Sequence, residues 1–226
     1  NIELSFCKNA DEVDVEKTDG IIAVGRFLSA ELEKMKQLGI QVLFVDSNPD
    51  PHEFNSIQPN LQMMVETAIE YFVQAGYQKI GFIGGRSWDS MEGRHVLRDT
   101  RTRCFESRAR ELGLFNQNYV FIGDNFSVDS GYQVGREIVG KIRDDLPQAF
   151  LVASDPLAVG VLQAFNENKL TVPEDVSMIS INDIDIAKYV SPPLTTFRID
   201  TEELGKVAIE TLRNLIVSPK KSKRMI

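Results

Sequence analysis

The sequence has 226 residues, of which 42% are hydrophobic and 26% are charged, and this composition excludes a disordered or fibrous chain. The length fits one large domain or two small ones, either of which can bury a substantial core. Lys and Arg number 25 and Asp and Glu number 33, so the formal net charge of −8 argues against nucleic acid or anionic membrane as a direct partner of these residues.

Short apolar segments recur along the chain, most of them without polar alternation, which is typical of parallel strands buried on both faces. The sequence predicts strands at residues 2–6, 21–24, 42–45, 80–83, 120–122, 150–153 and 177–181. The stretches between them carry helical spacing. This alternation predicts an α/β fold with doubly wound parallel sheet.

Three segments carry particular helix signals. From Leu61, apolar residues recur at i, i+3, i+4, i+7, i+8 and i+11, and Gly76 fits the C′ position behind them. A second helix is predicted with Asp155 as N-cap and Pro156 at its first position. A third follows Asp200, where Asp-Thr-Glu-Glu resembles a capping box.

Two stretches interrupt the alternation of strands and helices. Residues 48–60 are polar and contain three prolines, so they are predicted to be a loop or a crossing between lobes. In residues 189–198 a proline pair precedes a short extended segment. The sequence therefore predicts one lobe from residues 1–59 and 198–226 and a second lobe from residues 60–197.

Motifs for covalent chemistry or cofactor binding are scarce. Cys7 and Cys104 lack CxxC spacing, so neither a disulfide framework nor a zinc site is predicted, and a reducing cytoplasm is expected. No apolar run reaches the ~20 residues of a membrane span, and the first residues do not resemble a secretory signal. Walker, GxSxG and HExxH motifs are absent, and residues 81–85 do not match GxGxxG, so we expect no cofactor.

Catalytic and metal-binding interpretations have little support in the sequence. His52 and His95 are the only imidazoles, no serine or cysteine partner is indicated for either, and a surface histidine is the ordinary alternative. Asp183 and Asp185 could ligate a metal, but acidic pairs in loops after strands are common. We therefore expect neither an enzyme nor a bound metal.

Polar residues at the carboxyl ends of predicted strands form the candidate site, because ligands bind at that edge of an open α/β sheet. The candidates are Asp46, Arg101, Asp155 and Asn182, with Phe126 or Trp88 as an aromatic surface. Such a set suits a sugar, since sugar hydroxyls need donors and acceptors and the C–H face packs on a ring.

Each candidate also has a purely structural interpretation. Asp155 could only cap a helix, and Asn182 could form an Asx turn with its neighbour. Arg101 could be a solvated helix residue, and Asp46 could simply begin a loop. The aromatic residues could pack in the core, so spacing alone leaves both interpretations open.

Seven ordered segments resemble the effector-binding core of LacI/GalR family transcription regulators. They are DGIIA at 19–23, VD at 45–46, AGYQKIGFIGG at 75–85, DSGY at 129–132, ASDPLAVG at 153–160, VPEDVS at 172–177 and SPPLTT at 191–196. The proline pair followed by Leu-Thr-Thr separates this family from its periplasmic relatives. Within the family, Asp99-Thr-Arg101 with Phe105, and VDSNP at 45–49, most resemble galactose or evolved β-galactosidase repressors.

The resemblance implies two periplasmic-binding-protein-like lobes, a sugar or sugar derivative in the cleft between them, and a homodimer. Asp46 would then bond sugar hydroxyls, Arg101 would clamp the effector, and Phe126 would stack on the sugar ring. Ser154, Asp155 and Asn182 would occupy effector-contacting positions, of which Ser154 and Asn182 depart from the usual Asn and Asp. Compared with the family, the DNA-reading headpiece, the first strand and the final strand are expected to be missing.

The predicted function is the effector-binding and dimerisation domain of a sugar-responsive transcriptional regulator, a repressor by resemblance. Sugar binding would close the lobes and change the affinity of the full-length protein for operator DNA. A transport-type periplasmic sugar-binding protein is the first alternative. The second is a small α/β enzyme that uses Asp46 or the pair Asp183 and Asp185.

Overall fold

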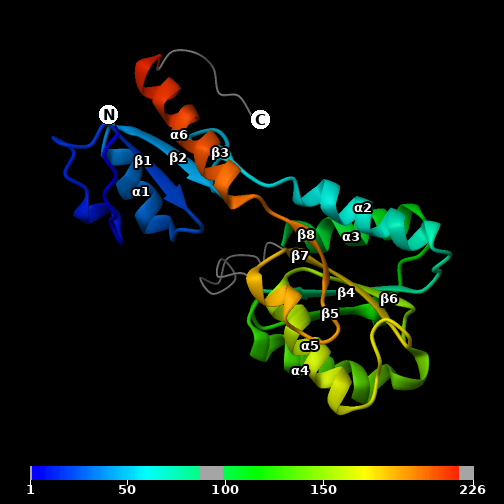
Figure 1. Cartoon of the computed structure of the whole chain (residues 1–226). Helices are drawn as coiled ribbons and strands as arrows, with labels where there is room; N and C mark the ends of the chain where they lie inside the picture. Colours follow the sequence, from blue (N-terminus) through cyan, green and yellow to red (C-terminus); the bar gives the residue numbers. More distant parts are fainter. Residues whose placement is uncertain (1, 87–98, 219–226) are drawn as a thin grey trace. The chain divides into compact units, whose positions relative to one another are not determined.

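The computed structural model describes residues 2–86 and 99–218 (Figure 1). The chain divides into a smaller unit, Asn1–Pro59 with Asp200–Ile226, and a larger unit, Asn60–Ile199. The sequence predicts the last boundary between 197 and 198. Arg198 pairs with Asn182 across the sheet, and the Ile199 N–H donates to the Asn182 carbonyl (3.2 Å), so both residues stay with the larger unit.

A three-stranded parallel sheet in the order β1-β2-β3 forms the centre of the smaller unit. Its elements are η1 (Ala10–Glu12), β1 (Gly20–Val24), α1 (Ser29–Gln37), β2 (Gln41–Val45), β3 (Asn55–Ile57) and α6 (Thr201–Val217). Successive β2 side chains point to opposite faces. Val42 and Phe44 pack in the cluster of α1, whereas Leu43 and Val45 pack with α6, so the two helices cover opposite faces of the sheet.

Two predictions for the smaller unit need correction. Residues 2–6 form no strand, and Ile2, Leu4 and Phe6 are 63%, 66% and 100% exposed. Within the described chain β1 pairs only with β2, so no neighbouring strand supplies the ladder that residues 2–6 would need. The stretch 48–60 is also not all loop, because β3 lies within it and pairs with β2.

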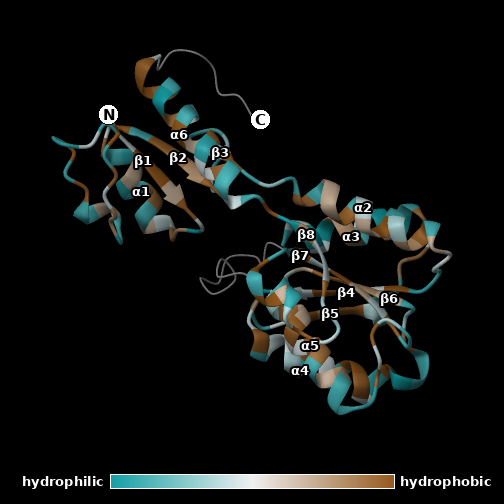
Figure 2. Ribbon diagram, viewed as in Figure 1, coloured by the Kyte–Doolittle hydropathy of each residue, from teal (hydrophilic) through white to brown (hydrophobic). Residues whose placement is uncertain are grey.

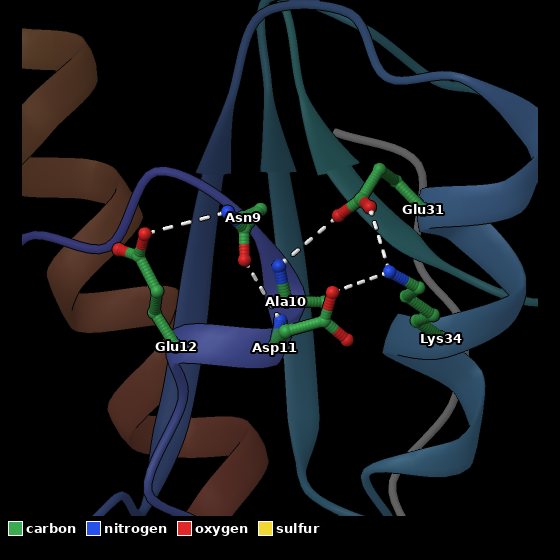
Figure 3. A network of polar contacts seen from close by, with 6 residues as sticks. All are labelled: Asn9, Ala10, Asp11, Glu12, Glu31 and Lys34. Carbon is green, nitrogen blue, oxygen red and sulfur yellow. Dashed lines mark hydrogen bonds and ion pairs between the residues drawn. The ribbon is translucent and has the colours of Figure 1, made fainter.

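A network of polar contacts joins η1 to α1 (Figure 3). Glu31 Oε2 accepts a hydrogen bond from the Ala10 N–H (3.0 Å). Lys34 forms ion pairs with Asp11 and with Glu31, and the hydrogen bond to Asp11 is the main cause of the raised pKa of Lys34. Because exposed ion pairs add little stability, the network serves mainly to hold buried Ala10 against the sheet.

The larger unit contains a five-stranded parallel sheet in the order β5-β4-β6-β7-β8. Its helices and strands are α2 (Leu61–Gln74), β4 (Ile80–Gly85), α3 (Thr100–Glu111), η3 (Gln117–Tyr119), β5 (Val120–Gly123), α4 (Val128–Ile142), η4 (Arg143–Asp145), β6 (Ala149–Val152), α5 (Asp155–Glu167), β7 (Ser177–Asn182), η5 (Asp185–Lys188) and β8 (Thr195–Arg198). Helices α2 and α3 cover one face and α4 and α5 the other (Figure 1). From β4 the chain continues to β5 on one side of it, and from β6 it continues to β7 on the opposite side. Because the two connections run in opposite directions from adjacent strands, a topological switch point lies between β4 and β6.

The predicted doubly wound parallel sheet is confirmed. Central strands β4 and β6 are buried throughout, and Figure 2 shows hydrophobic strands beside helices of mixed hydropathy. Gly76 adopts a positive φ of 85° behind α2, as its predicted C′ position requires. Asp200 caps α6 by accepting a hydrogen bond from the Glu203 N–H (3.0 Å).

Helices α4 and α5 pack backbone against backbone. A Cβ atom at Gly131 would lie 2.2 Å from the Leu157 carbonyl oxygen, and one at Gly160 would lie 2.0 Å from that of Val128. Any larger residue would therefore separate the helices. Helix α4 begins two residues after Phe126, so this contact positions the helix that directly follows that residue.

Asp145 links the starts of three strands at the amino edge of the larger sheet. It accepts hydrogen bonds from Lys79 Nζ (2.6 Å), just before β4, and from the Tyr119 hydroxyl (2.8 Å), just before β5. The hydrogen bond from Lys79, followed by that from Tyr119, lowers the pKa of Asp145. The group lies at the edge opposite the carboxyl ends of the strands.

Asp145→Asn is expected to lower the melting temperature slightly at neutral pH. A lowered pKa means that the carboxylate stabilises the fold above its unfolded pKa of about 4 and that this contribution disappears as pH falls through the folded value. Thermal unfolding at pH 7 and at about pH 2 should therefore show a difference between wild type and variant only at the higher pH. An equal difference at both values would contradict the assignment.

Candidate functional site

The predicted site residues of the larger unit gather at the carboxyl ends of adjacent strands around the switch point. Arg101 lies in the first turn of α3, behind β4, and Phe126 follows β5. Ser154 follows β6, and Asn182 is the last residue of β7. Parallel strands end at a common edge, and this is why residues so far apart in sequence share one site.

Arg101 is held by its neighbour Asp99 and by the end of β6. Asp99 caps α3 by accepting from the Arg101 N–H (3.0 Å), and its two carboxylate oxygens also accept from Arg101 Nε (2.7 Å) and Nη2 (3.0 Å). Arg101 Nη1 donates to the Ala153 carbonyl (2.6 Å). The Arg101 side chain is 13% exposed and that of Asp99 is 3% exposed, so the ion pair is largely desolvated. It connects the start of α3, behind β4, with the end of β6, on the two sides of the switch point.

Phe126 lies against the guanidinium of this pair. The centre of the Arg101 guanidinium is 4.6 Å from the ring centroid. The three side-chain hydrogen bonds use three of the five guanidinium N–H donors, so one donor on each of Nη1 and Nη2 remains for an acceptor oxygen. The predicted helix position of Arg101 is confirmed, but the side chain is largely, though not fully, removed from solvent.

Two buried polar atoms at this edge have no hydrogen-bond partner in the described chain. They are Ser154 Oγ and Asn182 Oδ1, from the ends of β6 and β7. Ser154 is the N-cap residue of α5, yet its hydroxyl makes no cap bond. Because buried polar atoms are nearly always paired in native proteins, these two oxygens are the atoms of this edge to which a polar ligand or a water molecule can bond.

Strained backbone conformations coincide with the same strand ends. Positive φ angles occur at Asn182 (126°) and Asp183 (56°), and at Asp46 (67°) in the smaller unit. Such angles cost about 1–3 kcal/mol each for non-glycine residues and cluster at functional sites. The Asx-turn interpretation of Asn182 finds no support, because its side-chain oxygen accepts no hydrogen bond from the described chain.

Asp155 is not the N-cap that the sequence predicts. The cap residue is Ser154, and α5 already begins at Asp155. The fully buried carboxylate instead accepts hydrogen bonds from the Ser180 and Thr196 hydroxyls (both 2.6 Å) and from the Ile184 N–H (2.8 Å). The one-residue shift turns the side chain toward β7 and β8, and its predicted ligand contact stays a prediction.

The smaller unit has a comparable edge at the end of β2. Asp46 is exposed, and its N–H donates to the Ile57 carbonyl (3.0 Å). The next two residues place Ser47 Oγ and Asn48 Oδ1 in buried positions without a partner among residues 2–86 and 99–218. Sequence reasoning missed Ser47 and Asn48, although both lie within three residues of the end of the predicted strand. A ligand contact by Asp46 stays a prediction.

Other predicted features lie elsewhere or outside the described residues. Trp88 and His95 belong to residues 87–98, which are outside them. The Asp185 carboxylate pairs with Lys188 (2.9 Å), and the backbone N–H of Asp183 donates to Thr196 Oγ1 (3.2 Å). In the described part of the chain, no three His, Cys, Asp or Glu side chains gather as metal ligands, and no helix is long and apolar enough to cross a membrane.

Comparison with known proteins identifies the relatives of the chain. A family model described as a periplasmic binding protein-like domain matches residues 69–226. The chain is 41% identical over 214 residues to the HTH-type transcriptional regulator GanR of Bacillus subtilis, covering 94% of this chain and 64% of that protein. It is 30% identical over 237 residues to the HTH-type transcriptional regulator GalR of Streptococcus thermophilus, covering 98% and 70%.

A solved structure shares the fold of the two units. The LacI family transcriptional regulator of Lactobacillus casei with bound sucrose matches with a TM-score of 0.75 at 19% identity, covering 96% of this chain and 78% of that one. Both units therefore have the parallel-sheet architecture of periplasmic-binding-protein-like lobes. The chain spans less than two thirds of the length of GanR.

Proposed function

The chain belongs to the LacI/GalR family of transcriptional regulators, and on that premise we propose that it is the effector-binding and dimerisation part of a sugar-responsive repressor. In the full-length protein, sugar binding would change the affinity for operator DNA, which a helix-turn-helix segment outside these residues would contact. The regulator would act in the cytoplasm as a homodimer. The relatives support this proposal because their names denote HTH-type transcriptional regulators.

The arrangement around Arg101 carries the sugar assignment. It offers two remaining guanidinium N–H donors, the Ser154 hydroxyl and the Asn182 side-chain oxygen within one strand edge. A sugar presents hydroxyls that both donate and accept, so it can satisfy all of these groups at once. The partly buried Phe126 ring adds an apolar surface beside them.

Binding of a sugar without its conversion distinguishes a regulator domain from an enzyme. The positioned groups are hydrogen-bonding ones, and the carboxylates of Asp99 and Asp155 are occupied by protein donors. We therefore propose recognition and no catalysis. Recovery of a converted sugar after incubation with the chain would contradict this part of the proposal.

Calorimetry with a panel of galactose, lactose, cellobiose, sucrose and ribose tests the ligand class. We expect at least one sugar to bind in the micromolar range, with mannitol as a polyol control that lacks the ring. The same sugar should change operator affinity of the full-length protein, and operator DNA should change the sugar affinity by the same factor. Failure of these sugars and of their phosphates to bind would overturn the site assignment.

A further inference from the structure

We propose that Asp155 is a positioning residue of this site, whose carboxylate holds the turn of residues 182–184 in the conformation that presents Asn182 to the sugar. The inference rests on the proposed function for the identity of the ligand. It assigns to Asp155 an indirect role in place of a direct contact with the effector.

The hydrogen bonds of Asp155 run to both strands that flank the turn and to the turn itself. Oδ1 accepts from the hydroxyls of Ser180 in β7 and Thr196 in β8, and Oδ2 accepts from the Ile184 N–H. Thr196 Oγ1 in turn accepts from the Asp183 N–H (3.2 Å). The two backbone N–H groups that follow Asn182 are therefore both held by the carboxylate, one directly and one through Thr196.

The turn needs such an anchor because its own conformation is unfavourable. Asn182 and Asp183 both have positive φ angles, which non-glycine residues adopt only when their surroundings hold them. Apolar packing contributes little here, since the Ile184 side chain is 39% exposed. Without the hydrogen bonds to Asp183 and Ile184, the backbone would relax and Asn182 Oδ1 would lose its orientation.

The carboxylate can remain buried because donors surround it. Asp155 is fully buried, and its three hydrogen bonds come from neutral groups. Its position as the first residue of α5 adds the positive end of the helix dipole. A carboxylate with these partners stays in place, so the geometry it imposes on the turn exists before any ligand arrives.

Ser180 provides an internal comparison. Its hydroxyl donates to the same carboxylate at the same distance as that of Thr196, but it lies inside β7 and forms no hydrogen bond with Asp183 or Ile184 in the described part of the chain. Loss of the Ser180 hydroxyl removes a buried hydrogen bond and leaves the turn anchored. Loss of the Thr196 hydroxyl removes a bond of similar length and also releases the turn.

The test compares Thr196→Val with Ser180→Ala, with Thr196→Ser as the conservative rescue and Asp155→Asn as the direct variant. The readouts are Kd for the tightest-binding sugar of the panel and hydrogen exchange of the Asp183 and Ile184 amides in the sugar-free protein. We expect Thr196→Val and Asp155→Asn to raise Kd by about 10-fold and to speed both exchange rates by a similar factor. Thr196→Ser should restore both values, and Ser180→Ala should change them by less than about 2-fold while lowering the melting temperature.

Two results would overturn the proposal. One is an equal rise in Kd for Ser180→Ala and Thr196→Val, which would make the network merely structural. The other is faster exchange at Asp183 and Ile184 with unchanged sugar affinity. If the wild-type chain binds none of the sugars, the proposed function fails, and the ligand part of this inference fails with it. The exchange rates of the Asp183 and Ile184 amides still decide whether the carboxylate holds the turn. If Asp155→Asn does not fold, the comparison of Thr196→Val with Thr196→Ser still decides the test.

Discussion

Arg101→Ala is expected to weaken binding of the effector sugar by about 100-fold or more. The two guanidinium N–H donors left by Asp99 and Ala153 are charged donors, and a hydrogen bond to a charged group contributes about 1.5–3 kcal/mol. Losing both removes on the order of 3 kcal/mol, which corresponds to about 100-fold in Kd. Calorimetry with the tightest-binding sugar of the panel measures this loss.

Two further variants separate recognition from folding. Arg101→Ala also removes the two guanidinium hydrogen bonds and the positive charge beside the buried Asp99 carboxylate, so we expect the variant to be less stable than wild type. Arg101→Lys keeps a positive charge but cannot bond Asp99 and Ala153 in the same planar geometry, so we expect an intermediate loss of about 10-fold. Arg103→Ala, on the exposed side of the same helix, should bind like wild type. Unchanged affinity of a folded Arg101 variant would remove Arg101 from the site.

Gly131→Ala is expected to destabilise the larger unit by about 2 kcal/mol and to lower its melting temperature by about 5–10 °C. The added Cβ would lie 2.2 Å from the Leu157 carbonyl oxygen, which belongs to a buried helix backbone and cannot rotate away. Helix α4 must therefore move from α5, and the cost of that separation exceeds the ~1 kcal/mol gained by replacing glycine with alanine in a helix. Thermal unfolding followed by circular dichroism measures the shift.

Gly140→Ala is the matched control, because the same substitution in the same helix meets no atom within 4 Å. This exposed position should gain up to about 1 kcal/mol from the better helix propensity of alanine. The two variants therefore differ in sign. A Gly131→Ala protein as stable as wild type would show that α4 and α5 do not pack backbone against backbone.

The sheets of this protein could be predicted largely from the sequence, because buried parallel strands leave a recognisable pattern. The unbroken apolar runs at 80–83 and 150–153 became β4 and β6 with small changes at their ends. Residues 2–6 alternate apolar and polar residues, which is a strand pattern of another kind, and they form no strand. A hydropathy pattern reflects the side chains of a segment, whereas a strand also needs a neighbouring strand for its hydrogen bonds. The wrong prediction for residues 2–6 therefore has a physical origin.

The grouping of the candidate residues at one sheet edge could be predicted from the sequence, but the contacts among them could not. Arg101, Phe126, Ser154 and Asn182 come together because each follows or ends a strand of one parallel sheet. The role of Asp155 depends on hydroxyls 25 and 41 residues away, in strands whose register no local motif specifies. The hydrogen bonds of Asp99 depend on the direction of the Arg101 side chain. That direction depends in turn on the Ala153 carbonyl at the end of β6, which is distant in the sequence.

The divided chain of the smaller unit dictates an order of folding. Helix α6 contributes Ala208 and Leu212 to the cluster that covers Leu43 and Val45, and the larger unit, residues 60–199, lies between the two pieces of chain. Closing a flexible loop of roughly 140 residues costs about 4 kcal/mol of chain entropy. The larger unit is continuous and avoids that cost, so it can reach its native structure first and shorten the effective loop. We therefore expect docking of α6 onto β2 to be the last folding step.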